Sequence, residues 1–276
     1  MRIFVTGHVG KLGSRVTTRL LDSGHEVVGY DRAVHAQHDI LHPATLNAAM
    51  QGCEVVVHTA AIPHPRKGDM ARYFRVNGEG TLNVLEAART NGVRRVVYTS
   101  STGFYGCDID GVLCPAYLPM DEAHPPAWVP GYGIGGLSAY NQSKAIAGAL
   151  LAWYGSNHVM ETVSLRIAPA NTKAEQYKPG LDWRAYHDWR RGALFCNCHP
   201  DYAAEAIVRA ALAPGALWGA VYNVVDQYTH RDIDARAFAR EAFGLELPDA
   251  WQDGESLITS ARIQDDLGWI PCEERA

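Results

Sequence analysis

Three residues of this 276-residue sequence have the types and spacing needed to move a proton to or from a substrate oxygen. Tyr140 and Lys144 are four residues apart, so a helix would place the phenol and the ammonium on one face, one turn from each other. A phenol with an ordinary pKa of about 10 is a poor base at neutral pH, and a nearby cation favours its phenolate. Ser101 follows an apolar run, and its hydroxyl could hold the substrate oxygen.

Each of these patterns is common by chance, so their meaning depends on a glycine-rich segment near the N-terminus. Its glycines form a G-x-x-G-x-x-G loop between a short β-rich run and a stretch with helical periodicity. Such a loop turns sharply, and the free N–H groups and dipole of the following helix favour a pyrophosphate. His8 could donate a hydrogen bond to the phosphates or point to solvent. The loop residues expected to contact a dinucleotide are Gly7, His8, Gly10, Lys11, Leu12 and Gly13.

An acidic residue after the second apolar run bears on the type of dinucleotide. Asp31 lies at about the separation expected of the acid that hydrogen-bonds the adenosine ribose, although it could also merely end a strand. Its carboxylate would repel a 2′-phosphate, which favours NAD over NADP. Arg32 could partly accept the 2′-phosphate, so the strictness of this preference stays open.

The elements that must position these residues alternate along the chain. Strand-like runs cover residues 2–6, 26–30, 54–58, 96–99 and 162–167, and helical periodicity covers 12–23, 76–91, 138–154 and 202–212. Because a parallel connection needs a crossover helix, this order predicts an α/β fold with a Rossmann-type doubly wound parallel sheet. Thr99, Ser101 and Thr102 would lie at its carboxyl edge, where such folds bind ligands. The proline- and glycine-rich residues 107–136 predict an irregular loop over that edge.

Composition excludes several classes of partner. Lys plus Arg number 25 and Asp plus Glu number 30, which gives a formal charge of −5, and no basic run suggests nucleic acid. No charged leader with an apolar segment begins the sequence, and no apolar stretch is long enough for a bilayer, so we expect a cytoplasmic protein without membrane contact. The six cysteines are expected to be reduced. Cys196, Cys198 and His199 lack the spacing and the second ligand pair of a metal site, so no metal is expected.

As a set, these motifs resemble the extended short-chain dehydrogenase/reductase family, which includes sugar-nucleotide epimerases and dehydratases. The resemblance covers most of the chain. It is carried by the glycine loop, Asp31, the pair Asp39 and Ile40, the stretch His58-Thr59-Ala60-Ala61, Asn77, Ser100-Ser101 with Tyr105-Gly106, and Tyr140 with Lys144.

The resemblance implies a role for each matching position. Ser101 would orient the substrate oxygen, Tyr140 would be the general acid or base, and Lys144 would lower the tyrosine pKa and bind the nicotinamide ribose. Thr102 could touch substrate or only bond the strand end, and Asn77 could contact the cofactor or only cap its helix. The further residues placed on the cofactor side are Asp31, Arg32, Asp39, Ile40, His58, Ala60, Ala61 and Thr99.

Departures from the family's pattern bear on the substrate. Pro169 stands where an Arg-x-x-Asn pattern would put asparagine, and only about a hundred residues follow, which suggests a small substrate and lid. Arg166 is kept as a candidate substrate contact. Part of the sequence is similar to uronate dehydrogenases, in which case Lys173 or Lys178 could bind a substrate carboxylate.

We therefore expect two parts: residues 1–168, mainly the dinucleotide-binding domain with the catalytic helix, and 169–276, mainly a small substrate-binding part whose chain returns to the core around 200–226. The leading hypothesis is NAD-dependent hydride transfer on a sugar, nucleotide-sugar or sugar-acid carbon that bears a hydroxyl. Dehydrogenase and epimerase share the first step, so both stay open, as does a noncatalytic NAD sensor. The resemblance also implies a homodimer formed by the helices near Val76 and Tyr140.

Overall fold

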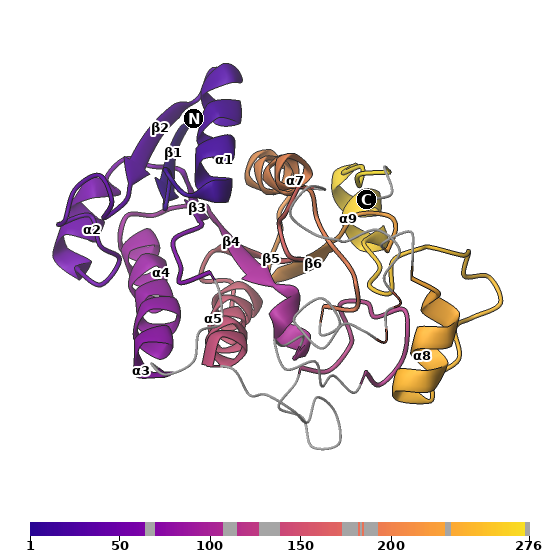
Figure 1. Ribbon diagram of the computed structural model, residues 1–276. Helices are drawn as coiled ribbons and strands as arrows, with labels where there is room; N and C mark the ends of the chain where they lie inside the picture. The colour runs from indigo at the N-terminus through magenta and orange to yellow at the C-terminus, as the bar shows by residue number, and fades with distance from the viewer. Residues whose placement is uncertain are drawn as a thin grey trace.

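A parallel β-sheet forms the centre of the molecule. The computed structural model describes residues 1–63, 70–106, 115–126, 139–172, 182, 184, 193–229 and 233–273. Within these residues, six parallel strands pair in the order β2-β1-β3-β4-β5-β6 (Figure 1). The predicted doubly wound parallel sheet is confirmed. The strands are β1 (Arg2–Thr6), β2 (Glu26–Tyr30), β3 (Val55–His58), β4 (Arg95–Ser101), β5 (Glu161–Ile167) and β6 (Ala220–Val224).

The central strands are buried because helices cover both faces of the sheet. All four residues of β3 are buried, as are all seven of β5. The parallel register pairs Thr6 with His58 and Ser101 with Ile167, so the carboxyl ends of β1, β3, β4 and β5 share one edge. The order of the strands reverses between β1 and β3, and such a switch point opens a crevice at that edge.

The helices form two layers (Figure 1). Helices α1 (Lys11–Asp22) and α7 (Pro200–Leu212) pack against each other on one face. Helices α2 (Pro43–Ala49), α4 (Gly80–Thr90) and α5 (Ala139–Ser156) cover the other face. None of the helices within the described ranges is long and apolar enough to cross a membrane.

The structure differs from the single helix predicted over residues 76–91. A short α3 (Met70–Tyr73) leads into a π-helical turn, η1 (Phe74–Glu79), and only then does α4 begin. The side chain of Asn77 in this turn bonds the backbone of Ile62 and the hydroxyl of Ser143. These contacts are made across the fold, so the local periodicity of the sequence did not reveal the wider turn. Single π-helical turns occur often at functional sites.

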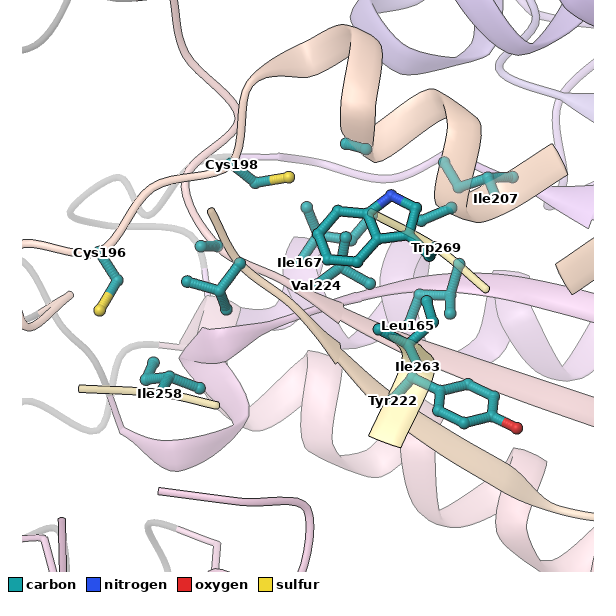
Figure 2. Close-up of a cluster of buried hydrophobic side chains, with 14 of the residues drawn as sticks. Leu165, Ile167, Cys196, Cys198, Ile207, Tyr222, Val224, Ile258, Ile263 and Trp269 are labelled. Atoms are coloured by element: carbon teal, nitrogen blue, oxygen red, sulfur yellow. The ribbon is translucent and has the colours of Figure 1, made fainter. Parts of the chain in front are cut away.

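Residues near the C-terminus complete the core on the α7 side. Helix α9 (Ala261–Leu267) lies against β6, and α8 (Ala235–Phe243) precedes it in the chain. Figure 2 shows Trp269 over Ile167 and Val224 of the sheet, close to Ile207 of α7. The Trp269 indole is 1% exposed, and its Nε1 donates to the carbonyl of Tyr202 at 3.0 Å. The division into two domains and the small lid stay predictions, because residues 173–181 and most of 183–192 lie outside the described ranges.

Candidate active site

A cavity of about 630 Å³ opens at the carboxyl edge of the sheet. Its walls come from the segments that follow β1, β2, β3, β4 and β5 and from the start of α5. Most residues predicted to touch a ligand line this one cavity. They are Gly7, Gly10, Lys11, Leu12, Gly13, Asp31, Arg32, Asp39, Ile40, Ala60, Ala61, Thr99, Ser101, Thr102, Tyr140 and Lys144.

The glycine loop has no room for side chains at two of its positions. Gly7 has φ +68, a conformation that residues with a Cβ rarely adopt. A Cβ on Gly13 would lie 2.0 Å from the carbonyl oxygen of Gly7, so only glycine lets α1 start this close to the loop. Gly10 precedes α1 and provides no capping side chain, and the first turn carries no acid. The N–H groups of this turn therefore suit an anionic ligand such as a pyrophosphate, and the loop fits a dinucleotide.

Acidic side chains lie at the adenosine end expected for that dinucleotide. Asp31 accepts hydrogen bonds from the backbone N–H of Ala33 at 2.9 Å and of Val9 at 3.4 Å, which ties the end of β2 to the glycine loop. Asp39 pairs with Arg32 at 3.6 Å. The cation that could have attracted a 2′-phosphate is thus partly neutralised, while the Asp31 side chain has no cationic partner of its own among the described residues and lines the cavity.

The serine, tyrosine and lysine meet at the other end of the cavity. Ser101 ends β4 and its Oγ accepts from the N–H of Gly103 at 3.0 Å. Tyr140, in the first turn of α5, shares a hydrogen bond with the Ser101 side chain. One turn later, the Lys144 Nζ donates to the carbonyl oxygen of Thr99 at 2.8 Å and lies 4.8 Å from the centre of the Tyr98 ring.

Burial controls the protonation of this group. It raises the pKa of the Tyr140 phenol above 10.0, an effect that the hydrogen bond with Ser101 opposes. It lowers the pKa of the Lys144 ammonium to about 7. The site therefore holds a protonated phenol beside an amine that gains and loses its proton near neutral pH, an arrangement suited to acid-base chemistry on a bound hydroxyl or carbonyl.

Four residues predicted to contact ligand do not line the cavity: His8, His58, Asn77 and Arg166. The His8 ring packs against Gly29, where a Cβ would lie 2.5 Å from His8 Cδ2. Arg166 stacks 3.7 Å from the centre of the Phe104 ring and donates to the carbonyl of Glu122 at 3.0 Å. His58 and Asn77 are buried behind the cavity wall. The ligand contacts predicted for these four residues stay predictions.

Other lining residues were missed. His38 precedes Asp39 at the adenosine end, where its ring stacks on Tyr30 with centroids 4.7 Å apart. Ser100 contributes a buried hydroxyl that has no hydrogen-bond partner among the described residues. Each of these two residues directly precedes a predicted site residue, Asp39 and Ser101, and this adjacency could have identified both from the sequence. Asn171 and Ala193 also line the cavity, but only tertiary folding brings them there.

The cysteine group of the sequence lies in the interior of the protein. Cys196 and Cys198 are buried free thiols (Figure 2), and the Cys196 Sγ lies 3.2 Å from Ser256 Oγ. The described part of the chain holds no cluster of three metal-ligating side chains. Lys173 and Lys178, named as candidates for a substrate carboxylate, lie outside the described residues.

Comparison with known sequences identifies relatives of this site. Residues 3–172 match the sequence profile of the "NAD dependent epimerase/dehydratase family". A 2-alkyl-3-oxoalkanoate reductase from Shewanella oneidensis is 32% identical over 181 residues, which are 59% of this chain and 43% of that protein. The chain therefore spans less than half the length of this curated relative.

Solved structures share the fold over nearly the whole chain. A short-chain dehydrogenase/reductase superfamily protein from Agrobacterium tumefaciens with bound NAD has a TM-score of 0.72 at 21% identity, covering 98% of this chain and 92% of its own. A UDP-galactose 4-epimerase has a TM-score of 0.67 at 25% identity, covering 98% and 93%. A mutated uronate dehydrogenase has a TM-score of 0.63 at 19% identity, covering 99% and 82%.

Proposed function

The chain belongs to the NAD-dependent epimerase/dehydratase family, and from that premise we propose that it catalyses reversible hydride transfer at a carbon bearing a hydroxyl, with Tyr140 as acid and base. The observation that carries the proposal is that Ser101, Tyr140 and the buried Lys144 line the same cavity as the glycine loop, with Lys144 held by the carbonyl oxygen of Thr99. A site for binding alone would not need a phenol and a buried amine one helical turn apart.

We propose the following orientation for NAD in the cavity. The glycine loop and the first turn of α1 would take the pyrophosphate, Asp31 the adenosine ribose, and Lys144 the ribose near Tyr140. NAD, when bound, supplies the hydride acceptor, and its reduced form supplies the donor. Ser101 would hold the substrate oxygen against the Tyr140 phenol.

The protonation state of the site sets how each direction depends on pH. Burial keeps Tyr140 protonated, which is the form that donates a proton to a carbonyl oxygen during reduction. Oxidation of a hydroxyl requires the phenolate, so we expect the rate of oxidation to rise with pH and that of reduction to fall. A protonated Lys144 favours the phenolate.

For the substrate we propose a sugar, nucleotide sugar or sugar acid. The likeness to a uronate dehydrogenase and a UDP-galactose 4-epimerase over at least 98% of the chain supports this proposal. A second candidate, an aliphatic oxo or hydroxy acid, is favoured by the likeness to 2-alkyl-3-oxoalkanoate reductase. It also agrees with the apolar part of the cavity wall, formed by Ile167, Ala168, Pro169, Ala170 and Ala193.

One experiment tests the activity and the substrate together. The purified protein is mixed with NAD and a panel of sugars, uronates and UDP-sugars, or with NADH and 2-alkyl-3-oxoalkanoates, while the absorbance of reduced nicotinamide is followed. Net accumulation with a sugar indicates a dehydrogenase, an isomerised sugar without accumulation indicates an epimerase, and consumption of NADH indicates the second candidate. The Tyr140→Phe variant should bind NAD but lose at least about 100-fold in turnover. If the wild type binds NAD and shows no turnover that Tyr140→Phe alters, the chain is a sensor.

We also propose that the chain forms a homodimer through α4 and α5. Ile146 and Trp153 lie on one face of α5 and are 45% and 58% exposed, and Leu82 of α4 is 38% exposed. Light scattering should give twice the chain mass for the wild type and a monomer for Trp153→Glu. A monomeric wild type at micromolar concentration would refute the dimer.

A further inference from the structure

His58 ends β3 directly behind the cofactor side of the cavity, and both nitrogens of its ring have partners. The side chain is 1% exposed. Its Nδ1 lies 2.7 Å from the Thr6 hydroxyl and its Nε2 lies 3.1 Å from the Thr81 hydroxyl. The buried ring of His58 therefore links strand β1 to helix α4.

The neighbouring bonds decide which ring nitrogen carries the proton. The Thr81 hydroxyl donates its proton to the carbonyl oxygen of Asn77 at 2.6 Å, so it must accept from His58 Nε2–H. In a neutral imidazole, Nδ1 then has a lone pair and accepts from the Thr6 hydroxyl. Burial and the charge of nearby Lys144 lower the pKa of His58 to about 3, so this neutral tautomer persists across the physiological range.

The Nδ1 side of this hydrogen-bond chain reaches the cavity wall, whereas the Nε2 side does not. The Thr6 hydroxyl, oriented by His58, accepts from the N–H of Ala60 at 3.2 Å. The chain on the Nε2 side ends at the Asn77 carbonyl, and the 2.8 Å bond from the N–H of Ile62 to the Asn77 side chain is separate from it. Ala60 and Ile62 line the cavity, and a Cβ on Gly7 would lie only 2.8 Å from the nitrogen of Ala60. The bond from Ala60 to Thr6 thus fixes the wall that faces the glycine loop.

We propose that His58 is a positioning residue for the dinucleotide, acting without touching it by holding the Thr6 hydroxyl so that the Ala60 wall keeps its spacing from the glycine loop. The two sides of the imidazole have different tasks. The Nδ1 side reaches Ala60 through one hydroxyl, whereas the Nε2 side ends on the Asn77 carbonyl and contributes to stability. The inference concerns NAD binding and does not depend on the proposed reaction or substrate.

Two substitutions of His58 separate these tasks. In His58→Asn, the amide oxygen occupies the place of Nδ1 and can still accept from Thr6. In His58→Gln, the amide nitrogen occupies the place of Nε2 and can still donate to Thr81. Each variant loses one buried hydrogen bond, so both should have a lower Tm. We expect the Kd for NAD, measured by calorimetry, to rise on the order of tenfold in His58→Gln and to stay within about twofold in His58→Asn.

A matched pair of threonine variants repeats the test without changing the ring. Thr6→Val removes the acceptor of Ala60 N–H, and Thr81→Val removes a hydroxyl equally buried on the opposite side. The Kd for NAD should rise in Thr6→Val and not in Thr81→Val, although both lose stability. If the Kd follows the Tm in all these variants, or stays at the wild-type value in all, His58 is only structural and the proposal is wrong. Because binding is measured directly, an inactive wild type would not affect this result.

Discussion

Replacing Lys144 by methionine should make the NAD-free protein more stable while abolishing its activity. The Lys144 side chain is 3% exposed, and burial lowers the pKa of its ammonium from 10.5 to about 7. Folding therefore places an amine that is charged in the unfolded chain in a site that disfavours the charge. Methionine has a similar length and carries no charge, so it removes this penalty.

The size of the effect follows from the two pKa values. One pKa unit corresponds to about 1.4 kcal/mol, so the difference between 10.5 and about 7 costs the folded state at most about 5 kcal/mol at low pH. Lys144→Met also leaves the carbonyl of Thr99 without this donor, a loss of about 1–3 kcal/mol. We expect the variant to be about 2–4 kcal/mol more stable than the wild type below pH 7.

The stability difference between Lys144→Met and the wild type should change with pH in a definite direction. Between about pH 7 and 10.5 the unfolded chain binds a proton that the folded chain does not, so the stability of the wild type rises with pH relative to that of the variant. The advantage of Lys144→Met should therefore shrink from pH 7 upward, vanish between about pH 8 and 10, where the remaining penalty equals the lost bond to Thr99, and reverse above that. Urea unfolding of both proteins across this range, with exposed Lys11→Met as the control, measures it. A variant less stable than the wild type at neutral pH, or an advantage unchanged at pH 10, would refute the reasoning.

Three further predictions concern the cofactor loop, the cofactor preference and the strand behind the catalytic serine. Gly13→Ala should abolish NAD binding in a titration, because its Cβ would collide with the Gly7 carbonyl, whereas Gly215→Ala, in open space, should bind normally. Asp31→Asn should raise the affinity for NADP relative to NAD by about tenfold, because the carboxylate would repel the 2′-phosphate. An unchanged ratio of the two Kd values would contradict this repulsion. Arg166→Met should lower the free energy of unfolding by about 2–3 kcal/mol, with little change in the Kd for NAD. If urea unfolding gives the same stability for the variant and the wild type, the stacked guanidinium contributes nothing to stability.

The sequence alone determined the elements whose signals are local. Short runs rich in β-branched and other apolar residues identified β1 to β5, most plainly β3, where three consecutive valines are buried. The glycine loop and the pair Tyr140 and Lys144 could be recognised by spacing, since the first depends on backbone conformation and the second on the helical period. These signals lie within a few residues of each other, so no knowledge of the fold was needed.

Only the tertiary structure decided which side chains reach the cavity. His58 and Arg166 lie in predicted strands, yet their side chains are taken up by Thr6 and Thr81 in one case and by Phe104 in the other. The π-helical turn at Asn77 and the lining residues Asn171 and Ala193 depend equally on contacts between distant parts of the chain. A buried polar group takes whichever partner the packing brings near, because leaving it unpaired costs more than any local preference supplies. Sequence spacing places a residue on an element, but the partners that satisfy its side chain come from the assembled fold.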